Sequence, residues 1–298
     1  MVKRRRWKSK LQVRGVIMKK VVKFGGSSLA NAEQFQKVGD IIRSDESRRY
    51  VVPSAPGKRF DEDIKVTDML YGCYDAASKG EDITEKINAI KARYYEIIKG
   101  LGLSLSLEEE FKKIDEDFRA QAGIQYAASR GEFLNGKIMA AYLGYDFVDA
   151  ASVIRFDKAG NLEAEETNKL LSKKLSKSQH AVIPGFYGAC ADGTVKTFSR
   201  GGSDVTGSLV AKAIHADIYE NWTDVSGFLV TDPRIVHNPE PIEAITYREL
   251  RELSYMGATV LHEDAIFPVR KEGIPINIRN TNSPEDKGTL IVESTCKK

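Results

Sequence analysis

The chain has 298 residues, of which 42% are hydrophobic, 29% charged and 9% aromatic, the composition of a globular protein large enough to bury a core. No apolar run approaches the roughly 18–20 residues that cross a bilayer, and the three cysteines form neither a CxxC motif nor a Cys/His cluster. These features exclude a transmembrane protein, argue against a disulfide scaffold or a zinc ribbon, and favour a cytoplasmic location.

The net charge of +3 originates in the N-terminal segment, because residues 1–20 contain nine basic residues and no acidic one. The other 36 basic residues face 42 acidic ones, a net charge of −6. We expect residues 1–20 to be a disordered basic extension. It is either an arm for nucleic acid or anionic lipid or an extension upstream of a start at Met18. The acidic body is unlike a nucleic-acid-binding domain, so neither a nucleic acid nor a membrane is an expected partner.

The first elements predict a parallel sheet. Residues 19–26 (KKVVKFGG) read as a buried strand that runs into a glycine turn, and 31–43 as a helix behind an Asn31 cap. Residues 50–55 read as the next strand. A strand, a helix and a second strand in this order are typical of a parallel pair joined by a crossover.

The central part of the chain is mostly helical. Helices are expected within 62–122, with apolar faces in 85–99 and 107–122, and again in 129–144. Short strands are expected at 146–149, 152–156 and 180–184, with a polar helix between the last two.

The last third alternates strands and helices. Residues 185–203 predict a hairpin with its turn at Asp192-Gly193. A helix over 205–214, a strand over 217–220, a helix over 247–256 and strands over 275–278 and 288–292 follow. The pattern indicates one continuous α/β domain with helices on both faces of a mostly parallel sheet.

Three polar loops follow predicted strands, and so would gather at one edge of a parallel sheet. They are 23–28 (KFGGSS), 199–207 (SRGGSDVTG), and 222–228 (WTDVSGF) with 231–234 (TDPR). Glycine backbone and hydroxyl groups can hold an anion, Lys23 and Arg200 supply cations, and Asp204 could hold a lysine or reach a metal-bound water. Each loop alone is also explained as an ordinary turn or helix cap. Together they favour phosphoryl transfer between a nucleotide and a small acceptor.

Motifs of other phosphate-binding families are missing from the sequence. It contains no G-x-x-x-x-G-K-[ST], no G-x-G-x-x-G after the first strand, and no H-R-D or D-F-G set. The four histidines are isolated from one another, so no protein metal site is expected.

Five motifs together resemble the aspartate kinases of the amino-acid kinase superfamily. They are KFGGSS (23–28), SRGEFL (129–134), FSRGGSDVT (198–206), TDVSGFLVTDPR (223–234) and GATVLH (257–262), in the order seen in that family. The resemblance implies a three-layer αβα sandwich with a central, mostly parallel sheet. It implies phosphorylation of the β-carboxylate of L-aspartate by ATP with Mg²⁺, the first step toward lysine, threonine and methionine.

The resemblance also implies a domain plan. Residues 21–298 would be the catalytic domain, with an aspartate-binding lobe over about 21–190 and a nucleotide-binding lobe over about 191–298. The paired ACT-type regulatory domains of most aspartate kinases are expected to be absent, and a homo-oligomer is allowed.

The roles of individual residues follow from their motif positions. Lys23 would stabilise charge on the transferring phosphoryl group, Asp204 would orient Lys23, and Gly25, Gly26 and Ser27 would bind that group. The expected aspartate-binding residues are Ser54, Thr67, Glu132, Arg200 and Ser203. The expected nucleotide-binding residues are Thr223, Asp224, Phe228, Asp232 and Arg234.

Three departures from the family pattern accompany the resemblance. Pro53 enters a strand end and 56–65 is an insertion-like charged loop, Thr259 stands where many relatives have a lysine, and Phe228 replaces a common tyrosine. Two alternatives to an aspartate kinase therefore stay open at this point. The chain could be a superfamily enzyme with another acceptor, or a catalytically weak fragment or binding subunit.

Overall fold

The computed structural model describes residues 18–199, 201–231, 235–237, 239–255, 261 and 263–294. Its strands are β1 (Lys20–Phe24), β2 (Arg48–Pro53), β3 (Asp146–Phe147), β4 (Ala181–Val182), β5 (Tyr187–Ala189), β6 (Val195–Thr197), β7 (Ile218–Thr223), β8 (Ala244–Thr246), β9 (Ile276–Asn280) and β10 (Thr289–Val292). Its helices are η1 (Ser27–Leu29, 3₁₀), α2 (Ala32–Arg43), α3 (Val66–Ser78), α4 (Thr84–Gly100), α5 (Glu108–Arg119), α6 (Ile124–Leu143), α7 (Ala150–Val153), α8 (Ala164–Leu175), α9 (Gly202–Ala213), α10 (Tyr247–Tyr255) and α11 (Glu263–Lys271).

The central sheet of the described chain has eight strands in the order β3-β4-β2-β1-β7-β9-β10-β8. From β3 to β9 every neighbouring pair is parallel, and β10 pairs antiparallel with β9 and parallel with β8. The predicted mostly parallel sheet is therefore confirmed. Since the six strands from β3 to β9 share one direction, their carboxyl ends lie along a single edge of the sheet.

Successive side chains of β1 point to opposite faces of this sheet, and each face carries its own apolar core. Val22 and Phe24 pack with side chains of α2 to α6 in one core. Val21 packs with side chains of α8 to α11 in the other. The predicted three-layer α/β architecture is confirmed.

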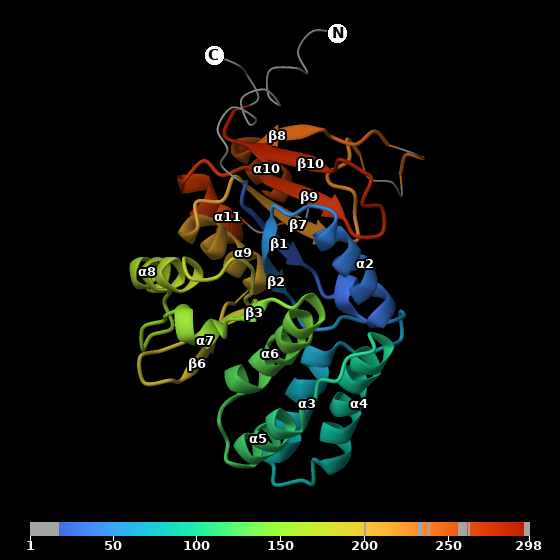
Figure 1. Cartoon of the computed structure of the whole chain (residues 1–298), viewed down its shortest axis with the longest axis vertical. Helices are drawn as coiled ribbons and strands as arrows, with labels where there is room; N and C mark the ends of the chain where they lie inside the picture. The colour runs from blue at the N-terminus through green and yellow to red at the C-terminus, as the bar shows by residue number, and fades with distance from the viewer. Residues whose placement is uncertain are drawn as a thin grey trace.

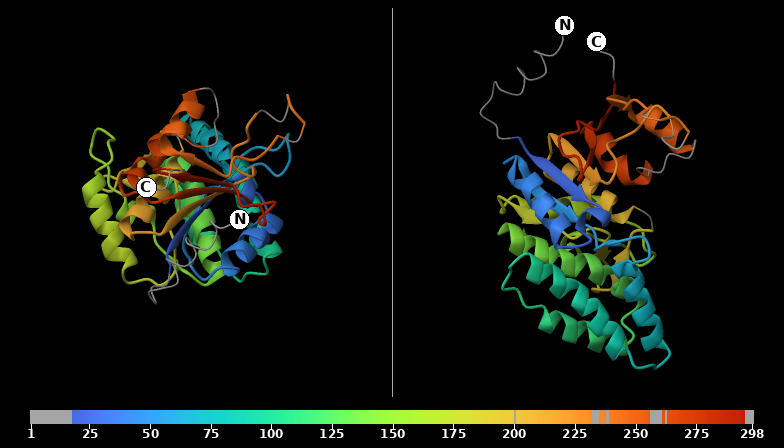
Figure 2. Two further views of the ribbon diagram at one scale, coloured as in Figure 1. Left: turned by 90° about the horizontal axis from the view of Figure 1, so that it is seen from above. Right: turned by 90° about the vertical axis from the view of Figure 1, so that its right-hand side faces the viewer.

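Figure 1 shows α3, α4, α5 and α6 gathered at one end of the molecule, and β8, β10, α10 and α11 at the other. Figure 2 shows the same separation from two further directions. Along the sheet, β1 lies between β2 and β7, so its carboxyl end is flanked by segments from both halves of the chain.

Two local predictions are confirmed, each with its physical cause. The Asn31 side chain accepts a hydrogen bond from the Gln34 N–H at 2.9 Å and so caps α2. Gly193, in the turn between β5 and β6, has φ of 89°, a conformation that favours glycine.

The strand predicted at 152–156 is wrong. The Asp149 side chain accepts a hydrogen bond from the Ala151 N–H and caps the short helix α7 at 150–153, whereas Arg155 and Phe156 form only isolated bridges. The run of Val and Ile had suggested a strand, but the cap decides the local structure.

Strand β8 and helix α11 are among the elements that the sequence did not predict. Strand β8 has only three residues, and α11 contains Pro268, which normally interrupts a helix. No described helix has the length and apolarity needed to cross a membrane. Residues 1–17, and with them most of the basic extension, lie outside the described residues.

Candidate active site

A buried lysine and a partly buried carboxylate meet at the carboxyl edge of the sheet. Lys23 on β1 lies directly across from Asn221 on β7, and its Nζ is 2.7 Å from Oδ1 of Asp204 in the first turn of α9. The Asn221 side chain links the two: its Nδ2 donates to the same Asp204 oxygen at 2.8 Å, and its Oδ1 accepts from Lys23 Nζ at 3.4 Å. The ammonium is thus held in one place by two acceptors.

The start of α9 requires glycine and small side chains. Gly201 has φ of 55°, and a Cβ on Gly202 would lie 2.6 Å from Cδ2 of Phe186. Ser203 packs equally closely, because a Cβ on Gly185 would lie 2.5 Å from its Oγ. The glycine pair in SRGGSD therefore brings Ser203 and Asp204 to the strand ends. Arg200 lies outside the described residues.

The glycine turn after β1 presents free backbone donors. The Gly25 N–H donates to Trp222 O at 3.1 Å, while Gly25 O and Gly26 O accept from the N–H groups of Ser28 and Leu29. The N–H groups of Gly26 and Ser27 have no acceptor within the described chain. Lys23 Nζ lies 3.9 Å from where a Cβ on Gly25 would be. An ammonium, two free N–H groups and the exposed Ser27 hydroxyl group thus occupy one short turn, an arrangement that suits an anion.

On the other side of this turn, helix α6 holds the end of β2. Asn135 Nδ2 donates to Ser54 O at 2.6 Å. A Cβ on Gly131 would lie 2.8 Å from the Ala55 Cβ and 3.8 Å from Thr67 Oγ1. The predicted residues Ser54, Thr67 and Glu132 are therefore brought together.

Glu132 is only 6% exposed, and within the described chain its Oε2 is a buried atom without a hydrogen-bond partner. Burial raises the pKa of the Glu132 carboxyl group to about 8, against smaller opposing effects of a hydrogen bond from the Ala55 backbone and of the Arg130 charge. A buried carboxylate oxygen with no donor is a cost to the folded protein that a cationic ligand can offset.

The expected nucleotide-binding residues lie only partly within the described chain. Thr223 ends β7 and Asp224 follows it, and the Thr223 hydroxyl group donates to Asp224 Oδ1 at 3.1 Å. Phe228 is buried, with its ring in the core on the α8 to α11 side of the sheet. Asp232, Arg234 and Thr259 lie outside the described residues.

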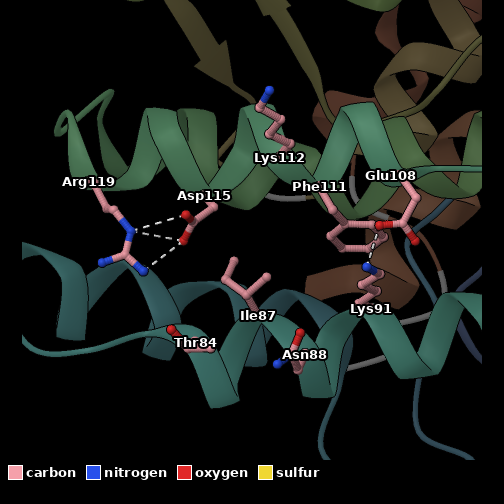
Figure 3. Close-up of a pocket in the computed structure, with 9 residues that line it drawn as sticks. All are labelled: Thr84, Ile87, Asn88, Lys91, Glu108, Phe111, Lys112, Asp115 and Arg119. Carbon is pink, nitrogen blue, oxygen red and sulfur yellow. Dashed lines mark hydrogen bonds and ion pairs between the residues drawn. The ribbon is translucent and has the colours of Figure 1, made fainter.

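A pocket of about 240 Å³ elsewhere contains none of the predicted site residues. It lies between α4 and α5, where Lys91 pairs with Glu108 and Arg119 pairs with Asp115 (Figure 3). The ionic side chains that line it are largely paired with one another. We therefore place the candidate site at the sheet edge.

Two residues of the site were missed in the sequence. Asn221 and Asn135 are buried and contact predicted residues directly. Asn221 lies in β7, but the strand predicted from the sequence ended at residue 220. Asn135 is one helical turn after Glu132. Each is a polar residue within an otherwise apolar strand or helix, near a glycine loop. That pattern in the sequence could have indicated a buried polar residue of the site.

The family model described as "Amino acid kinase family" matches residues 18–280 of this chain. The chain belongs to the amino acid kinase family. Its likeness to aspartokinases within that family is close. Aspartokinase 3 of Bacillus subtilis (strain 168) is 40% identical over an alignment of 289 residues that covers 92% of this chain and 63% of that protein.

Solved structures of aspartate kinases are also similar to this chain. The aspartate kinase of Clostridium acetobutylicum superimposes with a TM-score of 0.90 at 53% identity, covering 94% of this chain and 64% of that chain. Aspartokinase III of Escherichia coli, in complex with aspartate and ADP, has a TM-score of 0.80 at 28% identity and covers 94% and 65%. The chain thus spans just under two thirds of the length of these relatives.

Proposed function

We propose that this amino acid kinase transfers the γ-phosphoryl group of ATP to the β-carboxylate of L-aspartate, giving ADP and 4-phospho-L-aspartate. The observation that carries the proposal is the pairing of a held lysine beside free N–H donors with a buried, unpartnered carboxylate oxygen on Glu132. The first set suits a phosphoryl group, and the second suits the ammonium group of an amino acid.

The reacting β-carboxylate of aspartate is already an anion at neutral pH, so its attack on the γ-phosphorus needs no general base. A bond forms between a carboxylate oxygen and phosphorus, the bond to the bridging oxygen breaks, and ADP leaves. Catalysis then rests on positioning and on charge neutralisation. Lys23, held by Asp204 and Asn221, supplies a fixed positive charge, and the free N–H groups of Gly26 and Ser27 bind the phosphoryl oxygens.

Aspartate would lie between the α6 side and the start of α9. Glu132 binds its ammonium group, Arg200 its α-carboxylate, and Ser54, Thr67 and Ser203 complete the pocket. Thr223, Asp224, Phe228, Asp232 and Arg234 serve the nucleotide. In this arrangement the part of the chain up to about residue 190 supplies most of the aspartate pocket and the donors for the phosphoryl group. The rest of the chain supplies Arg200, Ser203 and the nucleotide-binding residues.

The donor set fits a Mg²⁺ ion that arrives with ATP. No cluster of three or more His, Cys, Asp or Glu side chains suited to a metal occurs among the described residues. Phosphates and water would supply most of the ligands of an ion that arrives with ATP. Asp204 uses Oδ1 for Lys23 and Asn221, which leaves Oδ2 as the oxygen that would hold the ion through bound water. The ion would neutralise phosphate charge.

The test is ADP release from MgATP with hydroxylamine present, which traps an acyl phosphate as a hydroxamate. L-Aspartate, L-glutamate and no acceptor are compared. We expect hydroxamate only with aspartate. ADP release without hydroxamate, or a preference for another acceptor, would contradict the proposed substrate.

A further inference from the structure

The loop between β2 and α3, residues 54–65, packs backbone to backbone against the glycine turn. The Gly57 N–H donates to Gly26 O at 2.8 Å. A Cβ on Gly57 would lie 2.6 Å from the Gly26 carbonyl carbon and 2.9 Å from Ser27 N. A shift of Gly57 would therefore move Gly26 and Ser27, the two residues whose N–H groups are free.

Arg93 on α4 makes hydrogen bonds to both ends of this loop. Its side chain is 5% exposed, and Nη2 donates to Gly57 O at 3.0 Å and to Ala30 O at 3.5 Å. Its Nη1 is 2.7 Å from Asp63 Oδ2 and 3.4 Å from Ile64 O. One guanidinium group thus joins the two ends of the loop to the segment just after η1.

An outer arginine shares the same carboxylate without reaching the glycine turn. Arg59 Nε donates to Asp63 Oδ2 at 2.9 Å, and its Nη1 donates to Glu96 Oε2 at 3.0 Å. Arg59 is exposed and, unlike Arg93, makes no hydrogen bond to Gly57 within the described chain. The two arginines therefore form a matched pair for a test.

We propose that Arg93 is a positioning residue for phosphoryl transfer: it fixes Gly57 against Gly26, and so fixes the N–H groups of Gly26 and Ser27. The inference rests on the proposed function, because that function places the transferring phosphoryl group on this turn. Neither sequence motifs nor the family resemblance assigns a role to Arg93.

The physical reason is that Arg93 is the buried side chain that bonds both to Gly57 and to the far end of the loop at Asp63. Residues 58–62 are exposed, so few apolar contacts hold them, and the planar Arg93 fork makes several bonds from one rigid group. A lysine at the same place carries a single point charge and can serve Asp63 or Gly57 but not both. A small shift of Gly57 would move phosphate donors that must match a transition state closely.

The first experiment compares Arg93→Met, Arg93→Lys and the control Arg59→Met with the wild type, measuring kcat and KM for MgATP and for aspartate. We expect Arg93→Met to lower kcat roughly 10- to 100-fold, Arg93→Lys to recover part of that loss, and Arg59→Met to stay within about twofold of wild type because it breaks only exposed bonds. Thermal unfolding of each variant shows whether the protein is folded. A folded Arg93→Met enzyme with wild-type kcat would overturn the inference.

The second experiment is a double-mutant cycle with Gly57→Ala, whose added methyl group presses on the backbone of Gly26 and Ser27. If both changes disturb one contact, the double variant should be no more than about threefold slower than the slower single variant. Independent effects would instead multiply, which would reduce Arg93 to a general structural role.

MgATP affinity, measured by titration calorimetry on the same proteins, separates the two proposals. An inactive wild type would count against the proposed reaction alone. The Arg93 inference would then be judged on whether Arg93→Met and Gly57→Ala weaken MgATP binding while Arg59→Met does not. Equal affinities in all four proteins would overturn it.

Discussion

Lys23 is held where a transferring phosphoryl group would need it. Asp204 and Asn221 restrain its ammonium group from two directions, and the glycine turn lies beside it. Because the charge is already oriented in a mostly buried site, it can stabilise developing negative charge without reorganisation.

Replacing Lys23 with methionine should therefore lower kcat by roughly 10²–10³-fold, the scale of losing one preorganised charged donor. Steady-state kinetics with saturating MgATP and aspartate measure the effect. Lys37→Met is the matched control, since Lys37 makes an exposed pair with Glu33 at 3.3 Å on α2. A Lys23→Met enzyme that keeps most of its kcat would contradict the role given to Lys23.

Glu132 predicts a pH dependence of aspartate binding. Its pKa is raised to about 8, chiefly by burial, so the carboxyl group without ligand is mostly protonated below that pH. Only the carboxylate pairs with an ammonium group. KM for aspartate should therefore rise as pH falls from 8 toward 6, by up to about tenfold per pH unit, and stay nearly constant just above 8.

The measurement is KM for aspartate at several pH values, beside KM for MgATP as an internal reference. Glu132→Gln should have a high and nearly pH-independent KM for aspartate. A wild-type KM that is flat from pH 6 to 8 would show that Glu132 does not titrate in the free enzyme or does not bind the substrate.

At the scale of elements, β1, β2 and β7 are joined by a buried charge network whose cations lie at the amino ends of β1 and β2. Glu220 on β7, 1% exposed, pairs with Arg48 Nε at 2.8 Å and Lys20 Nζ at 3.0 Å, and accepts from Trp222 Nε1 at 2.9 Å. Burial alone would raise the pKa of Glu220, but these two cations outweigh it and lower the pKa.

Glu220→Gln should destabilise the fold by about 3–5 kcal/mol, because it leaves the Arg48 charge buried without its partner. Urea unfolding at neutral pH measures this loss. Glu33→Gln, which removes one side of an exposed pair with Lys37, should cost less than about 1 kcal/mol. Because the pKa of Glu220 is lowered on folding, its contribution is present above the unfolded pKa and is lost in acid. Similar losses in both variants would mean that Glu220 adds little.

At the scale of the molecule, the site depends on the central place of β1 in the sheet. Its carboxyl end meets β2 and α6 from the first half of the chain on one side, and β7 and α9 from the second half on the other. Lys23 lies on β1 and Glu132 lies on α6, and these two elements are far apart in the sequence. The parallel sheet brings them to one edge, as in other α/β proteins that bind ligands there.

Much of the fold was predictable because local patterns agreed with it. The apolar run before Gly25-Gly26, the Asn31 cap and the turn at Gly193 each determine a local conformation on their own. The prediction failed at 152–156, where the Asp149 cap outweighs strand propensity. It also failed at α11, because Pro268 within the helix is a residue that normally argues against one. Short elements are fixed by their surroundings more than by their own residues.

By itself, the sequence determined the α/β class, the glycine turns and the motifs shared with aspartokinases, because these depend on neighbouring residues and on residue order. Only the tertiary structure decided that Asn221 restrains Lys23 and Asp204, that Glu132 keeps an unpartnered buried oxygen, and that Arg93 reaches the glycine turn through Gly57. Hydrogen bonds and desolvation act between residues distant in the chain, and no local pattern records which distant groups will meet.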